Sequence, residues 1–210
     1  MKRRVFMFLG LATLAAVWIG PLPELARASF SAHMTMHMAV VAVAAPLIAL
    51  GLAGGRFDPV RRAPRWFPPI PLSVVELVIV WAWHAPALHH FARGVPGGFV
   101  AEQGAFLGAG LAVWLSAFGG EEERRGDRVG AGIAALLLTS MHMTLLGALL
   151  ALTPRALYVH AAEMAAMTPL EDQHLGGAIM LLVGGVSYLV GGVWLTAGLL
   201  RTGAVRKEAV

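Results

Sequence analysis

Six apolar runs, each close to the length that crosses a lipid bilayer, constrain the fold of this chain more than any other feature. A helix needs about 20 residues to cross the hydrocarbon core of a membrane. The runs cover roughly residues 5–20, 33–54, 72–92, 99–119, 129–152 and 175–200. Only 13% of the residues are charged, whereas soluble domains average about 25%. The sequence therefore predicts an all-α, polytopic membrane helix bundle of about six spans, with the lipid bilayer around it.

The basic residues gather in alternate loops. All but three of the 16 Lys and Arg residues fall on one side of the membrane if the N-terminus lies there too, the exceptions being Arg27, Arg93 and Arg155. Because cytoplasmic loops carry an excess of Lys and Arg, this pattern predicts a cytoplasmic N-terminus. It also accounts for the formal net charge of +4, so the charge gives no reason to expect a nucleic-acid partner.

The chain is expected to form a single integral membrane domain over residues 1–210. Residues 1–28 form either a first helix or a secretory signal peptide, because they combine a basic start, an apolar run and an A-x-A pattern ending at Ala28. The membrane bundle covers residues 29–200 in either case. Residues 201–210 are expected to form a cytoplasmic tail.

Two further patterns concern the last third of the chain. The segment near 156–167 is too polar to span and predicts a short interfacial helix. In the last span glycine recurs every seven residues, at positions 177, 184, 191 and 198. Such a line of small residues predicts a seam of close helix contact.

His33 and His37 open the second apolar run one helical turn apart, so their imidazoles share one face of a helix. Methionines flank them at positions 34, 36 and 38. Imidazole with thioether is a ligand set suited to copper, and thioethers favour Cu(I). The chain has no cysteine, which excludes a thiolate site. The pair therefore predicts a copper site at the outer mouth of the bundle.

All eight histidines fall in the outer half of the predicted bundle or in its outer loops. Ionisable groups at membrane depth are costly, and those present there are candidates for function. The candidate metal ligands are His33, His37, His84, His142, Met34, Met38, Met141, His160, Met164 and His174. A lone histidine such as His142 can instead be a hydrogen-bonded packing residue, and a methionine can be core filler. His89, His90 and His160 also suit an ordinary interfacial role.

Several stretches occur in an order that is typical of one family. They are Phe30-Ser31-Ala32-His33-Met34-x-x-His37-Met38, Ala45-Pro46-Leu47, Trp83-His84-x-Pro86, Met141-His142-Met143 and Leu170-Glu171-Asp172-Gln173. The chain resembles, from about residue 28 to 200, the CtaG family of cytochrome c oxidase assembly factors, of the multi-spanning type that accompanies caa-type oxidases. It departs from the family pattern at Gln103, where a histidine is typical, and at His174, where a glutamine is frequent.

The resemblance implies a role in maturing the copper centre of a respiratory haem-copper oxidase. The implied partners are the catalytic subunit of the oxidase and a periplasmic copper donor. The implied location is the bacterial cytoplasmic membrane, with the site facing its outer side.

In the scheme that follows, outer-loop residues such as His160 and Met164 capture copper, which is expected as Cu(I). The residues expected to hold it at the outer mouth are His33, His37, His84 and His142. Glu102 and Asp172 are expected to orient ligands through hydrogen bonds, as carboxylates beside metal sites commonly do.

Two other functional classes stay open. Histidines at one depth on facing helices also suit a bis-histidine haem protein, for example with His37 opposite His84 or His142. A copper transporter is the third class, although Glu76 is the one ionisable group in the inner half of the predicted spans. No phosphate-binding glycine loop and no His-Glu-x-x-His motif occurs, so the chain is not expected to be an enzyme.

Overall fold

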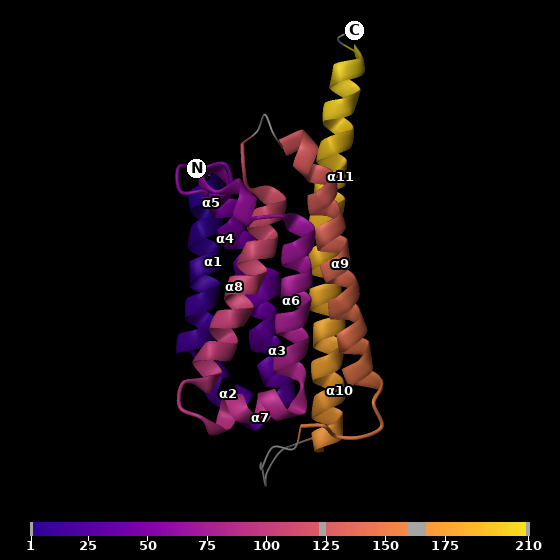
Figure 1. The fold of residues 1–210 in the computed structure, drawn as a ribbon. Coiled ribbons are helices and arrows are strands. Elements are labelled where there is room, and N and C mark those ends of the chain that lie inside the picture. The colour runs from indigo at the N-terminus through magenta and orange to yellow at the C-terminus, as the bar shows by residue number, and fades with distance from the viewer. Residues whose placement is uncertain (1, 122–124, 159–166, 209–210) are drawn as a thin grey trace.

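The computed structural model describes residues 2–121, 125–158 and 167–208. Within these residues the chain is helical and contains no strand, which confirms the predicted all-α fold. Figure 1 shows the long helices running side by side along one axis. The elements, in chain order, are α1 (Lys2–Ile19), α2 (Leu22–Ala28), α3 (Phe30–Met38), the π-helical turn η1 (Ala39–Ala44), α4 (Ala45–Leu52), α5 (Pro59–Arg62), the 3-10 turn η2 (Pro64–Trp66), α6 (Pro69–His84), α7 (Pro86–Gly94), α8 (Gly98–Phe118), α9 (Arg125–Leu152), α10 (Pro169–Ile179), the π-helical turn η3 (Met180–Gly184) and α11 (Gly185–Glu208).

By length and composition, four continuous segments could cross a membrane, and two bent helix pairs raise the number to six if each pair forms one span. The continuous segments are Phe30–Leu52, Gly98–Phe118, Arg128–Leu152 and Pro169–Arg201. α1 and α2 form one bent pair, with an angle of 53°, and α6 and α7 form the other, with an angle of 71°. The chain is thus a polytopic helical membrane protein, as its sequence predicts.

Arginine side chains bond to loop carbonyls at one end of the bundle. Both chain termini lie at one end (Figure 1), which we call the terminal end, and α2, α7 and the start of α10 lie at the other, which we call the histidine end. At the terminal end Arg3 donates to the carbonyl oxygen of Gly54 at 2.9 Å, and Arg128 donates to that of Phe67 at 2.7 Å. Two of the arginines that the sequence predicts on the cytoplasmic side therefore lie at the terminal end.

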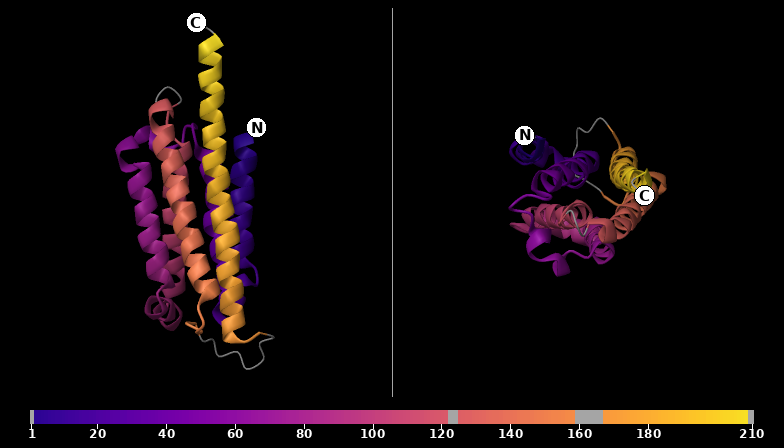
Figure 2. Two further views of the ribbon diagram at one scale, coloured as in Figure 1. Left: turned by 90° about the vertical axis from the view of Figure 1, so that its right-hand side faces the viewer. Right: turned by 90° about the horizontal axis from the view of Figure 1, so that it is seen from above.

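The last span begins earlier than the sequence predicts. Thr168 and Glu171 form a capping box that starts α10 at Pro169, because each satisfies a backbone amide that the helix itself leaves unpaired. α10 then packs closely on α9: a Cβ added to Gly177 would lie 2.7 Å from the carbonyl oxygen of Gly147. Figure 2 shows α11 continuing along α9 and extending beyond the rest of the bundle.

The seven-residue glycine repeat makes the close contacts predicted for it along most of its length. Gly177 lies against α9, Gly184 against Met38 and Met143, and Gly191 against Trp114. At the fourth glycine, Gly198, the position that a Cβ would take has no atom of another helix within 4 Å. The seam is therefore real over three of its four positions.

The structure does not bear out the start of the interfacial helix predicted in the last third of the chain. Of the interfacial helix predicted near 156–167, residues 156–158 are not helical and residues 159–166 lie outside the described part of the chain.

The first helix belongs to the bundle. α1 packs along α4, and a Cβ at Gly10 would collide with Ile48. Removal of residues 1–28 as a signal peptide stays a prediction.

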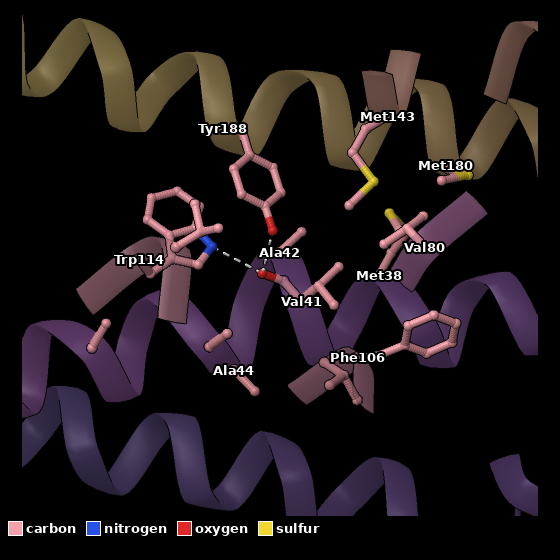
Figure 3. Close-up of a cluster of buried hydrophobic side chains, with 14 of the residues drawn as sticks. Met38, Val41, Ala42, Ala44, Val80, Phe106, Trp114, Met143, Met180 and Tyr188 are labelled. Atoms are coloured by element: carbon pink, nitrogen blue, oxygen red, sulfur yellow. Dashed lines mark hydrogen bonds between the residues drawn. The ribbon is translucent and has the colours of Figure 1, made fainter. Parts of the chain in front are cut away.

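The π-helical turn η1 interrupts the second span near the middle of the bundle. Pro46 follows it, has no amide hydrogen and excludes a regular hydrogen bond to the carbonyl four residues back. The carbonyl oxygen of Ala42, four residues before Pro46, accepts instead from the Ser187 hydroxyl at 2.6 Å. The carbonyl oxygen of Val41 beside it accepts hydrogen bonds from two other helices. Trp114 Nε1 donates to it at 3.0 Å and the Tyr188 hydroxyl at 3.4 Å (Figure 3). Buried backbone groups that lose their helical partner are in this way still paired.

Candidate metal site

Four histidine side chains meet at the histidine end, and we call them the histidine cluster. His33 and His37 project from α3, His84 ends α6, and His89 lies on α7. All four are buried, with at most 4% of their surface exposed. The ring centroid of His33 lies 6.1 Å from that of His84 and 5.1 Å from that of His89. The ring of His37 lies 6.5 Å from that of His33 and 5.2 Å from that of His84.

A carboxylate from another helix fixes the start of α3. Asp172 of α10 accepts hydrogen bonds from the backbone amides of Phe30, at 2.6 Å, and Ser31, at 3.1 Å. It also accepts from the hydroxyls of Ser29, at 2.8 Å, and Ser31, at 2.5 Å. The first amides of a helix have no partner inside it, and a negative charge there is favourable. Asp172 therefore positions the helix that carries His33.

The break between α6 and α7 brings His84 and His89 towards α3. Pro86 restricts the residue before it to extended conformations, and Ala85 accordingly has φ −64° and ψ 129°. α7 therefore turns away from α6 and lies across the histidine end (Figure 1). The carbonyl oxygen of His84 at the break accepts a hydrogen bond from the Tyr158 hydroxyl at 2.5 Å. Burial raises the pKa of the Tyr158 hydroxyl, which keeps it protonated as a donor.

Aromatic rings enclose the cluster. The ring centroid of Phe106 on α8 lies 3.9 Å from that of His37. Tyr158 stacks on Phe30 with centroids 4.1 Å apart, and it lies 4.5 Å from His89. All three aromatic side chains are buried. An enclosure of this kind lowers the local dielectric constant, which strengthens the electrostatic interactions inside it.

Hydrogen bonds decide which ring nitrogens keep a lone pair. Nδ1 of His84 lies 2.6 Å from the carbonyl oxygen of Val80. Because a carbonyl only accepts, Nδ1 carries the proton and Nε2 keeps the lone pair. Among the described residues, neither His84 Nε2 nor either ring nitrogen of His37 has a hydrogen-bond partner. A histidine that donates one N–H to a carbonyl and offers its other nitrogen has the arrangement usual at metal sites.

An arginine and a glutamate complete the site on the side of His33. Arg93 of α7 donates through Nη2 to His33 Nδ1 at 2.8 Å, and its Nη1 lies 3.3 Å from Glu102 Oε1. The same Nη1 donates to the carbonyl oxygen of His89 at 2.8 Å. Glu102 of α8 is fully buried, and its Oε2 lies 3.8 Å from His33 Nδ1. We call Arg93 and Glu102 the arginine–glutamate pair.

His33, His89 and Glu102 could hold a metal ion together. Each offers one ligand atom, and these atoms lie within 4.8 Å of one another. Imidazole nitrogens with a carboxylate oxygen suit copper or zinc. The rings of His37 and His84 lie 6.5 and 6.1 Å from that of His33, so two further imidazoles are within the same enclosure.

Of the ligands predicted from the sequence, the structure brings together His33, His37 and His84, with Glu102 beside them. His142 on α9 is also buried, at 5% exposure. Among the ring contacts of the described residues, none joins His142 to the histidine cluster. Its role as a ligand stays a prediction.

The methionines lie around the cluster rather than in it. Met34 and Met38 are buried and pack against α10 and η3 respectively. Figure 3 shows Met38 beside Met143 and Met180 in the apolar core of the bundle. Met141, by contrast, is 67% exposed on the surface of α9. Ligation by Met34, Met38 or Met141 stays a prediction, and the exposure of Met141 gives it no support.

The remaining candidates serve structural contacts or lie outside the described residues. His174 Nε2 lies 2.8 Å from the carbonyl oxygen of Thr153 and so links α10 to the end of α9. Asp172 caps α3 and does not contact the histidine cluster directly among the described hydrogen bonds. His160 and Met164 fall in the part of the chain that the structure does not describe.

The sequence interpretation missed His89 and Arg93 as parts of the site. His89 has the position of an interfacial residue in the sequence, yet it is fully buried. The signal was present: His89 and Arg93 lie four residues apart, hence on one face of a helix. Pro86 just before them marks the bend that turns this face towards α3.

One protein family matches the chain over nearly its whole length. The family model described as cytochrome c oxidase caa3 assembly factor (Caa3_CtaG) matches residues 1–202. No curated protein and no solved structure matches the chain. The family agrees with the resemblance inferred from the motifs around His33, His84 and His142. The chain belongs to the caa3-type cytochrome c oxidase assembly factor family.

Proposed function

We propose that this assembly factor binds copper in the histidine cluster and passes it to a haem-copper oxidase during assembly of the enzyme. The observation that carries the proposal is the convergence of buried imidazoles from three helices, with ring nitrogens of His37 and His84 that lack hydrogen-bond partners among the described residues. A buried polar atom without a partner costs about 1–3 kcal/mol. Coordination of an ion would recover this cost.

The chemistry of the ligands favours copper as the cargo. Imidazole binds copper well, and nearby thioethers such as those of Met34 and Met38 favour Cu(I). Glu102 supplies one buried negative charge, which suits a singly charged ion. The role is that of a carrier and not of an enzyme, in keeping with the description of the family as an assembly factor.

The location follows from the distribution of charge. Arg3 and Arg128 bond to carbonyl oxygens at the terminal end of the bundle, and basic loops stay on the cytoplasmic side. The histidine end then faces the outer side of a bacterial cytoplasmic membrane. There it would receive copper from a periplasmic donor and meet the catalytic subunit of the oxidase.

Haem and transport receive less support than copper delivery. The ring centroid of Phe106 lies 3.9 Å from that of His37, so a porphyrin ligated by His37 would have to displace this ring. Glu76, deeper in the bundle, is engaged by the Tyr188 hydroxyl at 2.6 Å and the Thr139 hydroxyl at 3.1 Å. These bonds make Glu76 part of the packed core, and a copper ion that used its carboxylate would have to displace them.

The proposal is tested by Cu(I) titration of the purified full-length chain in detergent, against a chromophoric Cu(I) chelator. Wild type is expected to bind Cu(I), and the double variant His33→Ala/His37→Ala to bind it more than about tenfold more weakly, since even indirect ligand contacts are worth that much. His90→Ala is the matched control, because His90 is exposed on α7 beside the buried His89.

Oxidase activity of membranes from strains carrying each variant gives the second readout. Loss of activity in the double variant but not in the control supports copper delivery. Retention of both Cu(I) binding and oxidase activity in the double variant would contradict it. A strong Soret band in purified wild type would instead favour the haem function.

A further inference from the structure

The arginine–glutamate pair occupies the part of the site that a metal ion would need. Arg93 Nη2 is 2.8 Å from His33 Nδ1, and Arg93 Nη1 is 3.3 Å from Glu102 Oε1. His33 and Glu102 are two of the three residues whose ligand atoms lie within 4.8 Å of one another. The guanidinium therefore contacts the same groups that would coordinate an ion.

Arg93 and a metal ion cannot use His33 Nδ1 at the same time. Because Arg93 only donates, His33 Nδ1 accepts the hydrogen bond with its single lone pair. A metal–imidazole bond of about 2.0–2.1 Å would need that same lone pair. Coordination by His33 at Nδ1 thus requires the guanidinium to leave.

The buried carboxylate of Glu102 requires a positive charge beside it. Its carboxylate is fully buried, and a buried charge without a partner is strongly unfavourable. In this structure Arg93 is that partner. If Arg93 left without a replacement, Glu102 would remain as an uncompensated charge inside the aromatic enclosure.

We propose that Arg93 is a displaceable cation that exchanges with Cu(I) at Glu102 and His33, and that its return promotes release of the ion. This inference rests on the proposed copper function. One positive charge leaves and one enters, so the charge of the enclosure is unchanged. No proton or electron is transferred, because His33 offers the same neutral nitrogen to either cation.

The position of Arg93 suits such an exchange. Its side chain is 13% exposed, whereas that of Glu102 is fully buried, so the guanidinium lies at the edge of the site. It is carried by α7, which meets α6 at the bend at Ala85. In the exchange, the side chain would turn about its own bonds towards water and give up its hydrogen bonds to His33 and to the carbonyl oxygen of His89.

The consequence is a moderated affinity for the cargo. A site whose competent conformation is populated to a fraction f binds with an apparent Kd larger by 1/f. If Arg93 occupies the site for more than about nine-tenths of the time, within the usual range for a minor state, the apparent Kd rises at least about tenfold. A carrier that must give up its ion benefits from this reduction.

Cu(I) competition titrations of the full-length chain in detergent test the inference with Arg93→Gln, Arg93→Lys and Arg155→Gln. Arg93→Gln is expected to lower the Kd for Cu(I) by at least about tenfold, and Arg93→Lys to stay closer to wild type because it keeps the charge. Arg155→Gln removes an exposed arginine from the same end of the bundle and should leave the Kd unchanged. Unchanged or weaker binding in Arg93→Gln would overturn the inference and assign Arg93 to positioning of His33.

A measurement on wild type removes any dependence on folding of the variants. Arginine modification by phenylglyoxal, mapped by mass spectrometry, is expected to increase at Arg93 when Cu(I) is added and to stay constant at Arg155. Constant protection of Arg93 would overturn the exchange. Failure of wild type to bind Cu(I) at all would overturn the proposed function as well, whereas binding without exchange overturns only this inference.

Discussion

Replacement of Asp172 by alanine is expected to loosen the helix that carries His33 and His37. The carboxylate accepts hydrogen bonds from two buried amides, those of Phe30 and Ser31, at 2.6 and 3.1 Å. In the Asp172→Ala variant these amides lose their acceptor. The Ser29 and Ser31 hydroxyls lose it too, but they lie 3.0 Å apart, so one of them can donate to the other.

The size of the effect follows from the two amides. Each buried donor left without a partner costs about 1–3 kcal/mol, which gives about 2–6 kcal/mol for the pair. Ser29 Oγ still accepts from the amide of Ala32 at 3.2 Å, so part of the helix cap survives. We therefore expect a loss of about 2–4 kcal/mol in the free energy of unfolding. For a chain of this size that lowers Tm by about 4–16 °C.

Thermal unfolding in detergent, followed by tryptophan fluorescence, measures the change. The matched control is Glu171→Ala, which removes the neighbouring carboxylate from an exposed capping box and should lower Tm less, because the loss of a helix cap costs about 1 kcal/mol. Cu(I) affinity should fall in Asp172→Ala and stay constant in the control, since only Asp172 bonds to α3. Equal Tm values and equal Cu(I) affinities for the two variants would refute the assignment of Asp172 as the cap of α3.

The same unfolding assay checks two further predictions. Glu76→Ala removes the acceptor of the Thr139 hydroxyl and the nearer acceptor of the Tyr188 hydroxyl, which keeps the Val41 carbonyl at 3.4 Å. It should cost about 1–3 kcal/mol, whereas Glu76→Gln keeps a side-chain oxygen and should cost clearly less. Equal losses in the two variants would argue against these bonds. Gly177→Ala places a Cβ 2.5 Å from a backbone nitrogen of α9 and should cost about 1–3 kcal/mol, while Gly104→Ala, with no heavy atom within 4 Å of the new Cβ, should be neutral or stabilising. A stable Gly177→Ala would show that α9 and α10 can separate without cost.

The helical fold is predictable from this sequence because the membrane imposes its own pattern. Apolar runs of spanning length and basic residues in alternate loops together define the spans and the separation of charge. Helix ends are less predictable, since they depend on individual side chains. The start of the last span at Pro169 is set by Thr168 and Glu171, which read as loop residues by hydropathy alone.

The site is predictable in part, and the reason is geometric. His33 and His37 lie one turn apart, so one helix alone brings them together, and shared depth adds His84. The contribution of His89 and Arg93 depends on the 71° bend at Pro86, whose direction no local pattern specifies. Likewise Asp172 meets Ser31 only because α10 packs on α3, a contact between distant parts of the chain.

The π-helical turn η1 sets the rotation of α3 relative to α4 about the helix axis, and the direction in which His33 and His37 point depends on this rotation. A π turn holds one residue more than an α turn, and one residue corresponds to about 100° of rotation about the helix axis. Deleting a single residue from Ala39–Ala44 would therefore rotate α3 relative to α4 by about that angle. His33 and His37 would then face away from His84. The number of residues between α3 and α4 is thus as much a part of the metal site as its imidazoles, and a chain one residue shorter there would keep every ligand in its sequence and lose the site.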